Sequence, residues 1–149
     1  MNLPIGNDSA LLPEANHCRI HHIGFVVASI EGVAHSFAQS IFATWDGRII
    51  HDPLQLVRIA FFKGHNPSDP LVELVEPHGF DSPVSSFLIR GGGPHHLCYE
   101  VNDLEKQLEF SRSLGGKMVK PPLPAAAFSG RRIAWIFTKN SLLLEFLER

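Results

Sequence analysis

Two pairs of adjacent histidines are the first residues in this chain that could carry chemistry. They are His21-His22 in "RIHHIGFVV" and His95-His96 in "GGGPHHLCYEV", each at the start of a run that alternates or stays apolar. A neutral imidazole is the commonest metal ligand in proteins and also a proton carrier near neutral pH. The recurrence of the doublet in one short chain therefore predicts a metal or acid–base site.

Two glutamates supply the second half of such a site. Glu73 in "PLVELVEP" and Glu145 in "SLLLEFLER" each interrupt an apolar run. A buried carboxylate is costly unless it is paired or bound to a cation. Two neutral imidazoles with two carboxylates suit one divalent metal ion, such as Co, Zn, Ni, Mn or Fe(II).

The chain repeats itself, and the repeat is what relates these residues. At an offset of 74 residues "HHIGFVVASIEGVAHSF" lies over "HHLCYEVNDLEKQLEF", and Glu73 matches Glu145 at an offset of 72. Each copy reads as a strand, an amphipathic helix and two or three further strands. These later strands are predicted over 56–64 and 71–76 in the first copy, and over 131–139 and 142–148 in the second.

The repeat sets the predicted domain organisation. Residues 1–18 read as a flexible N-terminal arm, and a linker with a short helix over 83–90 occupies 81–93. A second loop is predicted over 119–130, which is rich in proline. The two βαβββ modules then span 19–80 and 94–149 of one domain.

Strand alternation selects one histidine of each doublet. Successive side chains of a strand point to opposite faces, so His22 and His96 are expected to face away from the main apolar layer, on which His21 and His95 would lie. If the two copies pack about a pseudo-two-fold axis, His22, Glu73, His96 and Glu145 converge. The structural alternative for each residue alone is a packed or solvated side chain.

Composition excludes several classes of function. The formal net charge is −2, which indicates no general affinity for nucleic acid or anionic membrane. No apolar run is long enough to span a bilayer, and the N-terminus does not resemble a secretory signal. Two cysteines form no disulfide framework, so we expect a reduced, cytoplasmic setting. Exposed strand edges need cover, which favours a homodimer.

Three segments resemble the vicinal oxygen chelate (glyoxalase/bleomycin resistance/dioxygenase) superfamily, and within it most closely the methylmalonyl-CoA epimerases. They are "HHIGFVV", "VELVEP…DSPVSSFL…GGGPHHLCYEV" and "GRRIAWIFTKNSLLLEFLE", and the likeness covers about residues 19–149. The resemblance implies an α+β fold in which two βαβββ modules form a cup-shaped, curved mixed sheet. It also implies a metal held by His22, His96 and Glu145, with Glu73 at the fourth position.

The same resemblance implies an enzyme that stabilises an enolate of a carbonyl or acyl-thioester substrate, such as an acyl-CoA. Two features depart from the epimerases. Leu54 in "HDPLQLV" stands where they have an acid/base glutamate, and the loop before the last strand is shortened to Thr138-Lys139-Asn140. Glu73 and Glu145 are then the predicted proton carriers, one of them leaving the metal to act as a base.

Further residues and functions stay open at this level. Arg131 and Arg132 could hold a substrate carboxylate or phosphate, or could form ordinary ion pairs. The alternatives to an epimerase or isomerase are a glyoxalase-type lyase, an Fe(II) dioxygenase and a non-enzymatic small-molecule binding protein of the same fold.

Overall fold

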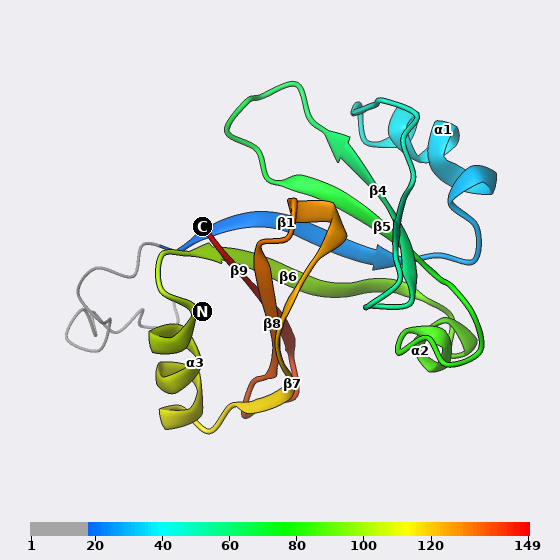
Figure 1. Ribbon diagram of the computed structural model, residues 1–149. Helices are drawn as coiled ribbons and strands as arrows, with labels where there is room; N and C mark the ends of the chain where they lie inside the picture. Colours follow the sequence, from blue (N-terminus) through cyan, green and yellow to red (C-terminus); the bar gives the residue numbers. More distant parts are fainter. Residues whose placement is uncertain (1–17) are drawn as a thin grey trace, which may run out of the picture.

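The computed structural model describes residues 18–149 (Figure 1). The first half of the described chain holds β1 (Arg19–Val26), α1 (Ile30–Ser40), β2 (Thr44–Trp45), β3 (Ile50–Asp52), β4 (Val57–Lys63) and β5 (Leu71–Pro77). After the short helix α2 (Ser85–Ile89), the second half holds β6 (Gly93–Val101), α3 (Leu104–Ser113), β7 (Lys117–Pro124), the 3-10 turn η1 (Ala126–Phe128), β8 (Arg132–Phe137) and β9 (Leu143–Glu148).

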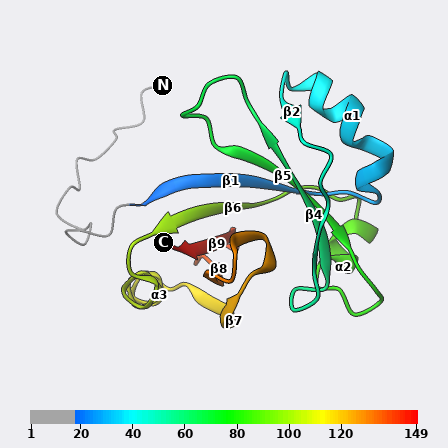
Figure 2. The same ribbon diagram turned by 45° about the horizontal axis from the view of Figure 1, so that its top comes forward.

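All strands join one mixed sheet in the order β2-β4-β5-β1-β6-β9-β8-β7, with β3 paired to β4. β1 and β6 are antiparallel neighbours at its centre, and each has a parallel partner on its other side, β5 and β9 respectively. Figure 2 shows β1 and β6 running side by side between the two halves. This curved α+β sheet agrees with the predicted fold class.

The two longer helices cover the outer face of the sheet. Ile30 and Ala34 of α1 pack on Phe62 and Leu74 in one half. In the other half, Leu104 and Leu108 of α3 belong to one buried cluster with Val101, Ala134, Ile136 and Phe146. Because strand side chains alternate, the neighbouring positions of the same strands face the opposite, concave side. The sheet therefore has an apolar layer on each face, and the concave layer holds the site.

Helix capping fixes where α1 and α3 begin. The Ser29 hydroxyl accepts a hydrogen bond from the backbone N–H of Gly32 at 3.1 Å, and the Asp103 carboxylate accepts one from that of Lys106 at 2.9 Å. Both residues have extended backbone, as N-caps do. Each helix therefore starts directly after a central strand, and each half forms a strand–helix unit.

The predicted loop over 119–130 is wrong for its first half. β7 continues to Pro124, and η1 follows. Proline is tolerated because β7 lies at the edge of the sheet and pairs with β8 alone. The register also shifts between Lys120 and Leu123, where Pro121 and Pro122 lie. The short strands β2 and β3 were not predicted either.

The predicted strands over 56–64, 71–76, 131–139 and 142–148 correspond to β4, β5, β8 and β9 within one or two residues at their ends, with the third differing most. The helix predicted over 83–90 corresponds to α2, which is shorter and spans Ser85–Ile89. Residues 1–17 of the proposed N-terminal arm lie outside the described residues. Within the described part, no helix is long and apolar enough to cross a membrane.

Candidate metal centre

Four buried side chains meet at the middle of the concave face, one from each of the four central strands. They are His22 of β1, Glu73 of β5, His96 of β6 and Glu145 of β9, and each is at most 6% exposed. The two imidazole Nε2 atoms lie 3.1 Å apart. The Oε2 atoms of Glu73 and Glu145 lie 3.3 and 3.2 Å from Nε2 of His22, and 3.3 and 3.1 Å from Nε2 of His96. We call these four residues the ligand cluster.

The strand register brings the ligand cluster together. Gly24 of β1 pairs with Glu73 on one side and with His96 on the other. Cys98 of β6 likewise pairs with His22 and with Glu145. Residues that pair across neighbouring strands point to the same face. Residues at matching places of the repeat therefore place their four side chains around one point.

Gly24 is required by the close approach of the His96 ring. A Cβ atom at this position would lie 2.1 Å from Cε1 of His96 and 2.5 Å from its Nδ1. The backbone of β1 thus forms part of the wall against which the His96 imidazole is held. A glycine in a strand interior commonly marks such an approach.

The charges of the ligand cluster support one another. Burial by itself would lower the pKa of His22, but the Glu73 carboxylate and hydrogen bonds with Cys98 and Glu145 raise it above its usual value. The pKa of His96 is raised as well, against burial, by hydrogen bonds with Glu145 and Glu73. Burial would raise the pKa of each glutamate, but the two histidines hold both below their usual range.

The donor atoms fit a cation. Two imidazole nitrogens and two carboxylate oxygens are the ligands of many divalent metal sites. Each carboxylate Oε2 lies 3.1–3.3 Å from both Nε2 atoms, which are themselves 3.1 Å apart. The two Nε2 atoms with either Oε2 therefore form a triangle whose three corners can all lie about 2 Å from one cation, the usual Zn–N and Zn–O distance. Two carboxylates would also balance the charge of the ion.

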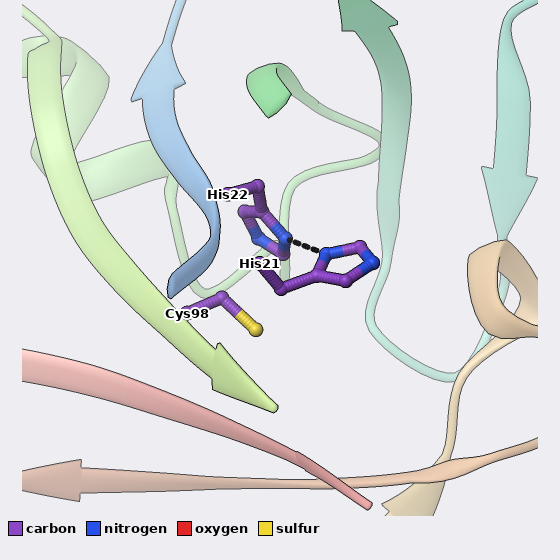
Figure 3. Close-up of side chains that lie close together, drawn as sticks. All are labelled: His21, His22 and Cys98. Atoms are coloured by element: carbon purple, nitrogen blue, oxygen red, sulfur yellow. Dashed lines mark hydrogen bonds between the residues drawn. The ribbon is translucent and has the colours of Figure 1, made fainter. Parts of the chain in front are cut away.

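The predicted facing of His21 and His95 is wrong. Nδ1 of His21 lies 3.0 Å from Nδ1 of His22, and Nδ1 of His95 lies 2.9 Å from Nδ1 of His96. Both therefore turn toward the ligand-cluster histidine beside them rather than to the opposite face, as Figure 3 shows for His21 and His22. The face that carries His22 was expected to be the less apolar one, yet His22, Gly24 and Val26 are the more buried residues of β1.

The reason for the unexpected facing is a β-bulge at each doublet. Ile20 pairs with Tyr99 and His22 with Cys98, so His21 is one residue more than its partner strand provides. On β6, His95 is the extra residue in the same way. A bulge redirects a side chain that regular alternation would send to the other face. Period-2 alternation in the sequence carries no signal for it.

Cys98 lies beside His21 and His22, as Figure 3 shows. Donor atoms of His21, His22 and Cys98 lie within 4.8 Å of one another, as do those of His22, Glu73 and His96. Burial, reinforced by the charge of Glu145, raises the pKa of the Cys98 thiol to about 12. Since a metal binds the thiolate, the ligand cluster is the better cation site of the two. Cys98 is fully buried, as a small core residue would be.

A cavity of about 510 Å³ opens beside the ligand cluster. Glu73, His96 and Glu145 line it together with His95 and Asp52. The rest of the lining is mostly apolar, with Phe87, Phe128, Trp135 and Phe137 as its aromatic residues. Arg90 and Lys120 are its basic residues. The cavity thus joins a polar centre to an apolar enclosure, as small-molecule sites do.

Leu54 and Gln55 lie on the segment that joins β3 to β4, and Asp52 is the last residue of β3. Leu54 is 57% exposed and is not among the residues lining the cavity. The buried Asp52 carboxylate accepts backbone hydrogen bonds from Leu54 and Gln55, both at 3.0 Å, and one from Ala126 at 3.0 Å. This carboxylate holds the β3–β4 turn against η1, so it is already engaged.

Gln55 is a functional candidate that the sequence did not indicate. It lines the cavity, and its side-chain amide nitrogen is buried without a hydrogen-bond partner. Leaving such a donor unpaired costs stability, and unpaired groups of this kind often serve a ligand. No local pattern in "HDPLQLV" separates this residue from an ordinary surface glutamine.

Arg131 and Arg132 form ion pairs outside the cavity lining. Arg131 lies 3.3 Å from the buried Glu100 carboxylate and over the ring of Phe128. Arg132 bonds Glu105 at 2.8 Å and Glu148 at 2.5 Å. The ion-pair alternative accounts for these contacts, and a role in substrate binding remains a prediction.

Comparison with known proteins places the chain in a family. The model of the glyoxalase/bleomycin resistance protein/dioxygenase superfamily matches residues 21–135. The uncharacterized Bacillus subtilis protein YqjC is 32% identical over 136 residues, which cover 87% of this chain and 91% of that protein. The ethylmalonyl-CoA/methylmalonyl-CoA epimerase of Cereibacter sphaeroides is 27% identical over 131 residues, with 85% and 95% covered.

A solved structure agrees with this placement. The crystal structure of a hypothetical protein from Bacillus halodurans superimposes with a TM-score of 0.75 at 29% identity, covering 89% of this chain and 94% of that one. Fold, repeat and family model all point the same way, and the chain belongs to the glyoxalase/bleomycin resistance protein/dioxygenase superfamily.

Proposed function

We propose that this protein is a metal-dependent enzyme of the epimerase or isomerase type, which removes a proton from the carbon beside the carbonyl group of an acyl thioester. The observation that carries the proposal is the ligand cluster itself, in which two imidazole Nε2 atoms lie 3.1 Å apart and each lies 3.1–3.3 Å from both carboxylates, at the edge of an apolar cavity.

The ligand cluster would hold one divalent cation through Nε2 of His22 and His96 and a carboxylate oxygen of Glu73 and Glu145. When bound, such a cation polarises a carbonyl oxygen and stabilises the charge that develops on it as the α-proton leaves. The cavity restricts water around that centre. In a less polar enclosure the attraction between the cation and the developing charge is stronger.

Glu73 and Glu145 are the proposed proton carriers. In each residue the same oxygen, Oε2, makes both contacts with the histidines, which leaves Oε1 as the atom that could accept a proton from substrate. The third acidic residue of the cavity lining, Asp52, is held by three backbone N–H groups. Leu54 cannot transfer a proton. A metal-binding glutamate that also acts as a base suits this arrangement best.

The proposed substrate class rests on the cavity and on the relatives. The Cereibacter sphaeroides relative is named for two acyl-CoA substrates, ethylmalonyl-CoA and methylmalonyl-CoA. The apolar lining suits a short acyl group, and Arg90 or Lys120 could meet an anionic part of the same molecule. The unpartnered Gln55 amide is available to donate a hydrogen bond to a substrate carbonyl or carboxylate oxygen.

Hydrogen exchange tests the proposal. The protein is stripped of metal, reloaded with Co²⁺ or Zn²⁺, and incubated with methylmalonyl-CoA in deuterated water. We expect deuterium at the α-carbon by mass spectrometry with loaded protein, and loss of most exchange after chelation or in Glu73→Gln and Glu145→Gln. Glu109→Gln, on the exposed side of α3, is the matched control and should exchange like the wild type.

Three results, one of them from a separate oxygen-uptake assay, would contradict the proposal in different ways. Metal binding without deuterium exchange would exclude methylmalonyl-CoA as a substrate. It would favour another carbonyl compound as the substrate, or a lyase reaction. Oxygen consumption with Fe²⁺ and a catechol would identify a dioxygenase instead. A protein that binds no metal at all would be a small-molecule binder rather than an enzyme of this type.

We also propose that the protein forms a homodimer. Large apolar side chains remain exposed in the single chain, among them Phe42, Phe80 and Ile89, each at least 77% exposed. Covering them against a second copy would bury apolar surface that is otherwise in water. Sedimentation equilibrium of the purified protein should give twice the chain mass of 16.5 kDa, and a monomeric mass contradicts the proposal.

A further inference from the structure

We infer that the first histidine of each doublet is a positioning residue, which holds the ligand imidazole beside it so that Nε2 of that imidazole faces the cation. His21 would act on His22, and His95 on His96. We call His21 and His95 the outer histidines. The inference rests on the proposed metal centre and deepens it, because it assigns the orientation of two ligands to residues that do not themselves join the ligand cluster.

The hydrogen bonds are the first support. Each ligand imidazole has its Nε2 atom in the ligand cluster and its Nδ1 atom 2.9–3.0 Å from Nδ1 of the outer histidine. A neutral imidazole carries one ring proton. If Nε2 gives its lone pair to a cation, the proton lies on Nδ1 and needs an acceptor. The outer histidine provides that acceptor. Metal-bound histidines commonly donate their other ring N–H to such a hydrogen-bond partner.

The β-bulges are the second support. In a regular strand, neighbouring side chains point to opposite faces, and one histidine could not reach the next across the backbone. Here His21 and His95 are each the extra residue of a bulge, on two different strands and at matching places of the repeat. A bulge interrupts the sheet ladder, so the same interruption in both halves indicates a shared purpose.

The outer histidines are themselves held by aromatic rings. The His21 ring packs edge-on against Phe128, with ring centres 5.3 Å apart, and lies 6.5 Å from that of Phe61. The His95 ring packs edge-on against Phe87 at 4.8 Å. Each outer histidine therefore sits between an apolar wall and the ligand it contacts. Figure 3 shows the contact between His21 and His22.

Cobalt binding to the full-length, metal-stripped protein tests the inference. His21→Phe and His95→Phe keep a ring of similar size but remove the acceptor nitrogen. We expect each to weaken Co²⁺ binding about 10- to 100-fold in a chelator competition and to change the visible absorption bands of bound Co²⁺. His21→Asn and His95→Asn place an amide oxygen near the position of Nδ1, and they should restore most of the affinity and the wild-type bands.

Controls separate positioning from general damage. His35→Phe changes an exposed histidine that contacts Trp45 outside the site, and it should bind Co²⁺ like the wild type. Circular dichroism checks that each variant is folded. If a Phe variant fails to fold, the Asn variant and the opposite doublet still provide the comparison. NMR of the imidazole nitrogens in the Zn²⁺-loaded wild type reports whether His22 and His96 carry their proton on Nδ1.

The outcomes distinguish this inference from the proposed function. If the wild-type protein binds no Co²⁺, both the proposed metal centre and the positioning role are excluded. Wild-type protein that binds Co²⁺, with His21→Phe and His95→Phe equal to it in affinity and spectrum, leaves the metal centre intact and overturns the positioning role alone. Phe and Asn variants that are equally weakened also overturn it, because the acceptor atom would then be irrelevant.

Discussion

At the scale of single residues, the site depends on mutual compensation. Each buried carboxylate of the ligand cluster is tolerated because imidazole groups contact it, and the imidazoles have raised pKa values because the carboxylates are there. A cation would take the place of the protons that such a cluster otherwise retains. The smallest residue nearby is equally necessary, since Gly24 leaves the space that the His96 ring fills.

Gly24→Ala should therefore damage the site more than a surface glycine change does. The new methyl group would lie 2.1 Å from the His96 ring, which must move or force the backbone apart. We expect a loss of about 1–3 kcal/mol in the free energy of unfolding by urea denaturation, with weakened Co²⁺ binding. Gly32→Ala in α1 is the control, and wild-type behaviour of Gly24→Ala would show that His96 has another position available.

At the scale of elements, each half is a strand followed by a capped helix, with further strands that bring one carboxylate. Helix α1 begins at the Ser29 cap and α3 at the Asp103 cap, which set the helices against the outer face. The bulges act at the same scale, because they keep β1 and β6 paired while turning both histidines of each doublet toward the site. The inner and outer faces of the sheet are thus specified by different features.

Asp103→Ala should lower the free energy of unfolding by about 1 kcal/mol, as the loss of an N-cap does. The removed carboxylate accepts the Lys106 backbone N–H at 2.9 Å. Chemical denaturation measures the change, and Co²⁺ affinity should stay the same because α3 packs on the opposite face of the sheet. Glu109→Ala on the same helix is the control. A destabilisation of Glu109→Ala equal to that of Asp103→Ala would contradict the role of the cap.

At the scale of the whole molecule, a buried carboxylate connects segments far apart in sequence. Glu100 of β6 bonds Arg149 near the C-terminus at 2.8 Å and lies 3.3 Å from both Arg19 of β1 and Arg131 before β8. Burial would raise the pKa of Glu100, but hydrogen bonds from Arg149 and Arg131 and the charge of Arg19 lower it to about 2. Folding therefore favours the charged form.

This linkage gives a defined pH dependence. Because the folded pKa lies below the ordinary value of 4.5, the contribution of Glu100 is complete above that pH and is lost as the pH falls toward 2. Glu100→Gln should lower the free energy of unfolding by about 1–2 kcal/mol at pH 7, allowing for solvent screening of the arginines. Urea denaturation should show this difference narrowing between about pH 4.5 and 2.5. A constant difference would contradict the assignment.

The sequence by itself determined much of this protein. The resemblance to a family implied the α+β fold. The repeat, the doublets and the two glutamates within apolar runs were enough to predict two copies of a strand–helix–strand unit and to select the four residues that the structure brings together. Such features are local in the sequence or follow from a simple offset between the two copies. Alternation of apolar residues with period two then identifies the strands. Their roles as metal ligands and proton carriers remain proposals.

Only the tertiary structure decided the rest. The facing of His21 and His95 depends on how β1 pairs with β6, which alternation along one strand cannot encode. The proline-rich segment became an edge strand because β8 offered it a partner on one side alone. Asp52 was engaged by the backbone of η1, and Gln55 was left with an unpaired donor in the cavity, since both outcomes depend on which distant segments fold against the β3–β4 turn.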